Sequence, residues 1–119
     1  MEKVNLQSKA QLIKDFWSPK ILGDLNGQQV KLVKVKGEFV WHHHDNEAEL
    51  FLVVSGNLKM EFHDSISLLA PGEFIIVPPG VEHRPSAVEE TVILLFEPAS
   101  TLNTGNLKND FTKKDLEQI

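Results

Sequence analysis

The chain has 119 residues, of which 41% are hydrophobic and 24% charged, a composition typical of one folded domain and too apolar for a disordered chain. Its formal net charge is −5 and Arg84 is its only arginine, so it lacks the positive potential that nucleic acids attract. It has no cysteine, which excludes disulfides, thiolate metal sites and cysteine nucleophiles.

The first residues contain no apolar stretch like that of a signal peptide. No later run approaches the ~20 apolar residues that are needed to span a bilayer. We therefore expect a cytoplasmic protein with neither a membrane nor a nucleic-acid partner.

The N-terminal segment predicts one short helix. Ser8 and Gln11 have the spacing of a capping box, and apolar residues follow at helical spacing. This helix should end before Ser18-Pro19, because proline disfavours helical geometry in the residue that precedes it.

Residues 21–97 have the pattern of short strands separated by turns. Asn26-Gly27, a dipeptide well suited to a type I′ turn, joins the first two strands into a hairpin. The predicted strands cover residues 21–25, 28–35, 38–44, 48–54, 58–62, 67–69, 72–77, 82–84 and 91–97. Many short strands with glycine and proline turns favour an all-β sandwich or barrel over a parallel sheet with helices.

Strands 50–54 and 74–77 are apolar on both faces, so the face that does not line the barrel needs a cover. The N-terminal helix and hairpin could supply it, or a second subunit, and we expect a homodimer built by sheet extension or face-to-face packing. Residues 99–119 form a polar tail, in which the run from Thr112 to Asp115 predicts a last short helix. One domain over residues 1–119, with a barrel core of about 21–97, is the expected organisation.

Four residues combine metal-ligand chemistry with suitable spacing. His42 and His44 are two positions apart in a predicted strand, so their imidazoles share a face. Glu49 enters the next strand, and strand pairing would return its carboxylate beside them. His83 can join only through closure of the barrel. Such a donor set suits one divalent ion of Fe, Mn, Ni, Cu or Zn.

Two ordered motifs make the chain similar to the cupin superfamily. The first family motif, G-x5-H-x-H-x3,4-E-x6-G, is matched from Gly37 through His42, His44 and Glu49 to Gly56, with the first gap one residue short. The second motif, G-x5-P-x-G-x2-H-x3-N, is matched at Gly72, Pro78, Gly80 and His83, with Ala87 in place of the final asparagine. Two spaced motifs in so short a chain make a chance match improbable.

This resemblance covers roughly the central half of the chain. It implies a small double-stranded β-helix barrel of the jelly-roll type, with one divalent metal held by His42, His44, Glu49 and His83, and it also implies pairing of barrels. Small single-domain cupins are often labelled as similar to mannose-6-phosphate isomerase. With a single arginine in a short chain, we take that label as an analogy of fold only.

Several nearby residues have alternative interpretations. Glu47 could replace Glu49 as the oxygen ligand, although we favour Glu49. His43 should face away from the ligands, and His63 should be an exposed loop residue. Arg84 could orient an anionic substrate, but a surface ion pair is the simpler explanation.

Apolar residues could also line a pocket beside the metal. Phe51, Met60, Phe62 and Ile76 are the candidates, with ordinary core packing as the alternative. Trp41 should pack on the outside, because it alternates away from the ligand face.

The leading functional hypothesis is a metal-dependent enzyme, an oxygenase or isomerase-like catalyst of a small polar or anionic metabolite, in which Glu47 could move protons. The alternative is a non-catalytic module that binds or senses a small molecule, because fold alone does not fix function. A third hypothesis treats the metal as a clamp that only stabilises the fold.

Overall fold

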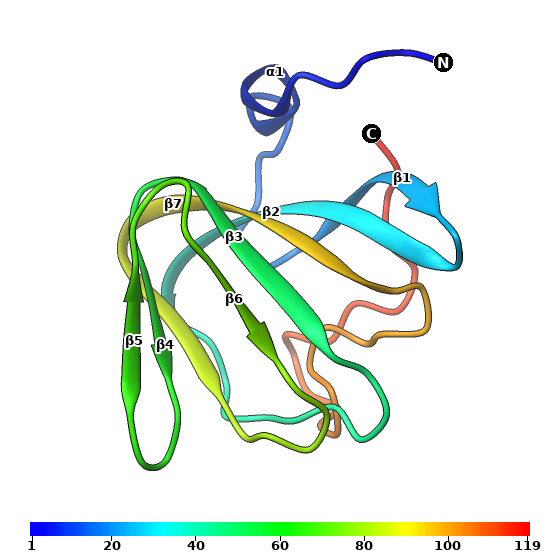
Figure 1. Ribbon diagram of the computed structural model, residues 1–119. Helices are drawn as coiled ribbons and strands as arrows, with labels where there is room; N and C mark the ends of the chain where they lie inside the picture. Colours follow the sequence, from blue (N-terminus) through cyan, green and yellow to red (C-terminus); the bar gives the residue numbers. More distant parts are fainter.

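The computed structural model describes all 119 residues as a curled antiparallel sheet with one short helix outside it (Figure 1). Its elements, in chain order, are α1 (Leu6–Ala10), β1 (Lys20–Leu25), β2 (Gln28–Glu38), β3 (Glu49–Ser55), β4 (Leu58–Glu61), β5 (Ile66–Leu69), β6 (Phe74–Val77) and β7 (Arg84–Pro98). The expected all-β barrel of the jelly-roll type is therefore confirmed.

Strand β7 organises the sheet. The strand order is β1-β2-β7-β3-β6, and β4 lies off this path, where it pairs with both β5 and β7. The first residues of β7 pair with β4, and its later residues pair with β3, while β2 runs along most of its other edge. The register of β2 with β7 shifts between Val35 and Gly37, and such a bulge bends a sheet so that it can close.

Inward-facing apolar side chains fill the barrel. Val33 and Val35 of β2, Phe51 and Val53 of β3, and Ile93 of β7 belong to one core cluster. They follow the period-two alternation of strands, which leaves the other face of each strand outside the barrel.

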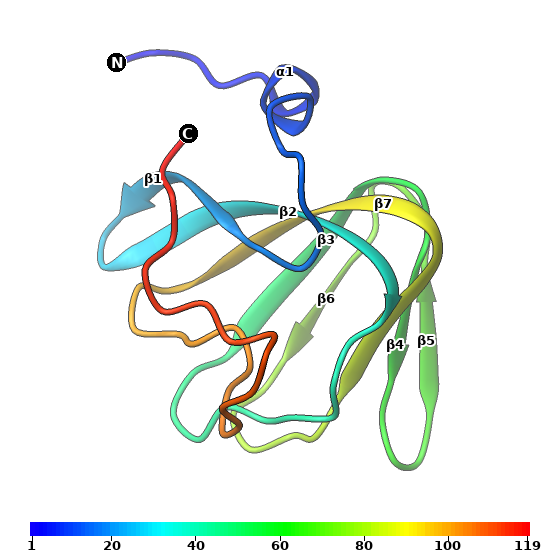
Figure 2. The ribbon, with the colours of Figure 1, turned by 180° about the vertical axis from the view of Figure 1, so that it is seen from behind.

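A second, smaller apolar cluster lies on the outer face of the sheet. Ile13, Leu32 and Val92 are buried there, and Leu6 and Ala10 of the N-terminal segment pack against them. Figure 2 shows this segment above the outer face of the sheet. This cover is only partial, because Phe74 and Ile76 of β6 remain 59% and 54% exposed. Ile76 therefore points outward, contrary to the prediction that it lines the pocket.

The N-terminal helix differs from its prediction in position and length. Asn5 is the N-cap, with its side-chain oxygen accepting a hydrogen bond from the Ser8 backbone at 2.8 Å, and the helix ends at Ala10. The competing cap at Asn5 moves the first turn three residues toward the N-terminus.

The predicted C-terminal helix is absent. The Thr112 hydroxyl, expected to cap it, instead bonds to the Thr104 hydroxyl at 2.7 Å and accepts from the Asn109 backbone at 3.0 Å. These bonds hold residues 104–112 as a compact loop, so the Thr112 hydroxyl is not free to cap a helix.

Two strand predictions were also wrong in extent. Residues 39–44, predicted as part of a strand over 38–44, lie instead in a loop with one isolated bridge, and residues 84–98 form one long strand rather than two. Residues 88–90 continue β7 although they are exposed, because pairing with β2 resumes on both sides of the bulge.

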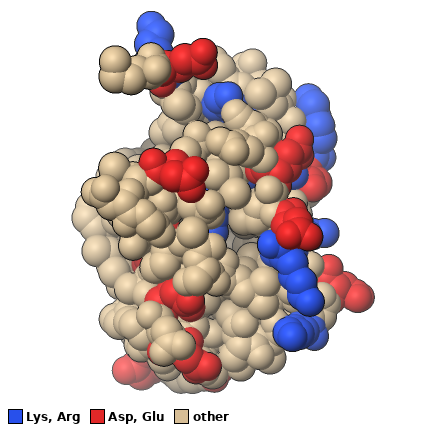
Figure 3. Space-filling model, turned by 90° about the vertical axis from the view of Figure 1, so that its right-hand side faces the viewer, with Lys and Arg blue, Asp and Glu red and all other residues tan.

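On the face drawn in Figure 3, basic and acidic side chains are interspersed rather than gathered by sign.

The only helix has five residues, and no helix has the length and apolar character needed to cross a membrane.

Candidate metal centre

Two loops that are distant in sequence carry the candidate ligands. The loop 39–48 joins β2 to β3 and carries His42 and His44, while the loop 78–83 joins β6 to β7 and carries His83. Reciprocal backbone bonds pin the loops together, from His42 N to His83 O at 3.0 Å and from His83 N to His42 O at 2.9 Å. Gly80 N adds a third bond to His44 O at 2.7 Å.

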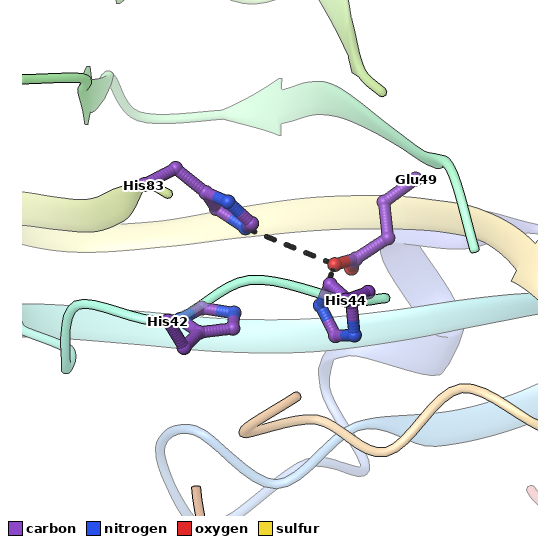
Figure 4. Close-up of side chains that lie close together, drawn as sticks. All are labelled: His42, His44, Glu49 and His83. Carbon is purple, nitrogen blue, oxygen red and sulfur yellow. Dashed lines mark ion pairs between the residues drawn. The ribbon is translucent and has the colours of Figure 1, made fainter. Parts of the chain in front are cut away.

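The side chains of His42, His44, Glu49 and His83 converge inside the barrel, with one potential ligand atom from each lying within 4.8 Å of the others (Figure 4). All four are at most 5% exposed. Glu49 Oε1 contacts His44 Nε2 directly and lies 3.8 Å from His83 Nε2. These four residues could therefore hold one metal ion.

Hydrogen bonds fix which imidazole nitrogen faces the centre. His42 Nδ1 lies 2.9 Å from Val40 O, and His83 Nδ1 lies 2.8 Å from Val81 O. A carbonyl can only accept, so each Nδ1 carries the proton and each Nε2 keeps a free lone pair. This is the tautomer that a metal-binding histidine needs.

Three buried atoms at the centre have no hydrogen-bond partner, namely His44 Nε2, His83 Nε2 and Glu49 Oε1. Leaving such atoms unsatisfied costs about 1–3 kcal/mol each. A divalent ion would satisfy all three at once, so the donor set fits the proposed metal.

Burial also sets the protonation of the histidines. It lowers the pKa of His42 to about 3, with a further decrease from the neighbouring His83, and it lowers the pKa of His83 to about 4. The pKa of His44 is lowered for the same reason. At neutral pH all three imidazoles are uncharged, the form that binds a metal.

A buried ion pair beside the centre was not predicted from the sequence. Lys31 Nζ donates to Glu97 Oε1 at 2.8 Å, and the two side chains are only 1% and 2% exposed. A signal did exist, because strand alternation places Lys31 on the same face as the core residues Val33 and Val35. A charged residue at an inward position indicates a buried partner.

The carboxyl groups of Glu49 and Glu97 influence each other. Burial raises the pKa of Glu49 to about 7. Burial and the adjacent Glu49 carboxylate raise the pKa of Glu97 well above its usual value. Lys31 opposes both shifts, so the three groups act as one unit that holds a proton near neutral pH.

A cavity of about 40 Å³ adjoins His42 and Glu49 inside the barrel. Its mostly apolar wall includes Trp17, Phe39 and Phe51, and Glu97 also lines it. Of the four residues predicted to line such a pocket, only Phe51 does so; Met60 and Phe62 belong to the core.

Glu47 lies outside the group of four side chains that could hold a metal. Its Oε2 accepts from Ser100 Oγ at 2.9 Å, in a polar recess beside His44. His43 also lies outside the group, with Nε2 2.9 Å from Asp45 Oδ1.

The remaining candidates form contacts at the surface. His63 is two-thirds exposed and pairs with Glu82 at 2.9 Å. Trp41 stacks on the His63 ring. Arg84 pairs with Glu38 and Glu61, each at 3.1 Å.

Comparison with known proteins identifies relatives of this fold. The family model described as "Cupin domain" matches residues 29–97. Protein YdbB of Bacillus subtilis, described as uncharacterized, is 32% identical over 94 residues, which are 78% of this chain and 83% of YdbB.

Two solved structures are similar over nearly their whole length. A cupin-2 domain protein from Shewanella frigidimarina is 44% identical with a TM-score of 0.79, covering 80% of this chain and 93% of its own. Protein NMB1881 from Neisseria meningitidis is 31% identical with a TM-score of 0.75, covering 82% of this chain and 100% of its own.

Proposed function

This chain belongs to the cupin family, and we propose that it is a metal-dependent enzyme that binds one divalent ion through His42, His44, Glu49 and His83. The observation that supports this proposal best is the convergence of buried, unpartnered ligand atoms from two loops. Their neutral imidazoles need no proton to be removed before they bind a metal.

Bound there, a divalent ion supplies Lewis acidity toward an oxygen atom of the substrate. The residues of the chain supply the surroundings. Phe51 and the other apolar wall residues exclude water from the cavity, which strengthens electrostatic interactions inside it. Glu97, in the cavity wall, holds a proton within the barrel.

These surroundings favour a small polar or anionic metabolite as substrate and an oxygenase or isomerase-like reaction. The only buried lysine beside the centre, Lys31, is already paired with Glu97. An anionic group of the substrate would therefore bind at the four-residue centre, with the apolar part of the molecule against Phe51. A phosphate group would find no arginine there, because Arg84 pairs with Glu38 and Glu61.

Two carboxyl groups are candidates for proton transfer. Glu97 would serve a substrate in the cavity, which it lines. Glu47, favoured from the sequence, would serve only a substrate that enters through the recess beside His44.

The alternative is a non-catalytic cupin that binds or senses a small ligand, because the same fold supports both kinds of function. The two functions separate when Fe-, Mn- and Zn-loaded protein is screened against metabolites by oxygen uptake and mass spectrometry. Turnover with any metal would exclude the binding module. Tight binding without product for every metal would exclude the enzyme.

Metal content is the first measurement. We expect about one equivalent of metal in the wild type and a large loss in His44→Ala and His83→Ala. His63→Ala is the matched control, because this histidine is exposed and outside the centre. Unchanged metal in the first two variants would refute the site.

We further propose a homodimer that packs through the exposed apolar face of β6 and β3. Phe74 and Ile76 pair across the sheet with Leu52 and Leu50, and none of these four residues is charged. An exposed apolar face of this kind can be covered by the same face of a second copy across a two-fold axis. Phe74→Glu should shift the apparent size in gel filtration from dimer to monomer, and a monomeric wild type would refute the proposal.

The cytoplasmic location stays a prediction.

A further inference from the structure

Residues 99–119 lie beyond the segment that the family model matches, yet they pack against the candidate metal centre. We call these residues the strap. Figure 2 shows the strap, in orange and red, crossing the end of the barrel where the ligand loops lie. It is fastened near its start by a bond from Ala99 N to Gly27 O at 3.1 Å and near its end by a bond from Ile119 N to Ile21 O at 3.0 Å.

Between these two points the strap binds the ligand loop 39–48. Asn106 N donates to His43 O at 3.0 Å, and His43 N donates to Asn106 Oδ1 at 2.9 Å. His43 stands between the two candidate ligands His42 and His44. The reciprocal bonds therefore fix the backbone that carries both imidazoles.

The neighbouring Gly105 makes the closest approach. A Cβ atom at this position would overlap the His43 carbonyl oxygen and would lie 2.9 Å from its carbon and 3.1 Å from His42 Cδ2. Its φ of +58° is in the left-handed region, which favours glycine. The strap thus touches both the loop backbone and the ring of one candidate ligand.

The strap is rigid enough to position what it touches. Thr104 is fully buried, and its hydroxyl bonds to Leu107 O at 2.7 Å and to the Thr112 hydroxyl at 2.7 Å. Phe111 packs edge-on against Phe39 with ring centroids 5.1 Å apart, and Phe39 in turn packs edge-on against His42 at 5.4 Å. The strap supports the imidazole of His42 from two sides.

We propose that Gly105 and Asn106 are positioning residues of the metal centre, which hold His42 and His44 in the arrangement that binds the ion. This inference rests on the proposed metal site. Partners that orient metal ligands change metal affinity by about 10–100-fold when they are mutated.

The first test compares two glycine variants. Gly105→Ala should lower the affinity for Co(II) or Zn(II), measured by competition with a chelator, by about 10–100-fold. Gly72→Ala is the matched control, because its φ is +86° but nothing lies within 4 Å of the added Cβ. It also places an alanine at positive φ, but without a contact to a ligand loop, so its metal affinity should stay within about threefold of the wild type.

The second test remains valid if Gly105→Ala does not fold. Asn106→Ala should weaken metal binding and change the absorption spectrum of the Co(II) protein, whereas Asn106→Asp, which keeps an acceptor for His43 N, should restore both. Asn109→Ala is the control, because its side chain accepts only from Phe111 N within the strap.

The possible failures are distinguishable. A wild-type protein that binds no metal would refute the proposed function itself. A wild type that binds metal, with Asn106→Ala and Gly105→Ala equal to their controls in affinity and Co(II) spectrum, would refute only the role of the strap.

Discussion

Replacing Lys31 with methionine should strongly destabilise the metal-free protein. The substitution removes the ammonium group 2.8 Å from Glu97 Oε1 and leaves two buried carboxyl groups without a cation. Breaking a buried pair in this way costs about 3–5 kcal/mol. A domain of this size has a free energy of unfolding of about 5–15 kcal/mol, so the loss is a large part of the total.

The sign of the pH dependence follows from the pKa of Glu97, which is already raised in the wild type. A carboxyl with a raised pKa gives stability that is complete below its unfolded pKa and is lost as the pH rises through its folded pKa. Removing Lys31 raises the pKa of Glu97 further. The destabilisation of Lys31→Met relative to wild type should therefore be small near pH 5 and grow once the pH passes the folded pKa values of the two carboxyl groups, of which that of Glu49 is about 7.

Two further variants distinguish the loss of one partner of the Lys31–Glu97 pair from the loss of both. Lys31→Met/Glu97→Met replaces the whole pair with apolar side chains of similar volume and should recover most of the lost stability. Glu97→Met alone should be milder than Lys31→Met, because Lys31 still has the Glu49 carboxyl nearby.

The assay is urea unfolding between pH 5 and 8 with a chelator present, followed by tryptophan fluorescence. Lys59→Met is the control, because Lys59 is exposed and its partner Glu61 keeps an ion pair with Arg84, so the change in stability should be less than about 1 kcal/mol. The reasoning is wrong if Lys31→Met behaves like this control, or if the double variant loses the sum of the two single losses.

Three other predictions follow from the centre. Metal binding should release about one proton near pH 6–7, because the ion displaces the proton that the Glu49 carboxyl, with a pKa of about 7, shares with Glu97. Calorimetry in buffers of different ionisation enthalpy measures this release. No proton release at pH 6 would contradict the prediction. Between pH 6.5 and 3, the buried His42 should reduce the stability of the metal-free protein by about 1.4 kcal/mol per pH unit, because its pKa is lowered to about 3. The raised pKa of Glu49 opposes this loss down to its ordinary value of 4.5, so the loss should be steepest below that pH. Acid titration by circular dichroism tests this, and His42→Gln should flatten the curve. A chelator should lower the melting temperature without unfolding the protein at 25 °C, because the hydrophobic core of the barrel does not depend on the metal. Complete unfolding would instead support the hypothesis that the metal acts only as a clamp of the fold.

Local patterns predicted most of the sheet, and long-range contacts explain the errors. The Asn26-Gly27 hairpin follows from turn chemistry alone, and both residues have positive φ, 52° and 81°. A strand over residues 38–44 is predicted from the turn signals on both sides of it, but residues 39–44 lie in a loop. Its conformation depends on a bridge to His83, which no local pattern reveals.

The ligand candidates were predicted because their spacing is regular, whereas the residues around them were not. Lys31 and Glu97 are 66 positions apart and meet only because β2 pairs with β7. The contact of Asn106 with His43 spans 63 positions, and it depends on a loop without regular structure. Such partners carry no periodic signal that the sequence alone could show.

The long strand β7 has a consequence for when the four candidate ligands can meet during synthesis. Its residues pair with β2, β3 and β4. Gln28 can therefore pair only after Pro98 has been synthesised, and His42 only after His83. Pairings so distant in sequence form late, because the chain between them loses entropy before any contact is made. A nascent chain that has emerged only through Glu49 therefore exposes three of the four candidate ligands with no barrel around them. If the proposed metal site is real, its four side chains can converge only after β7 has left the ribosome.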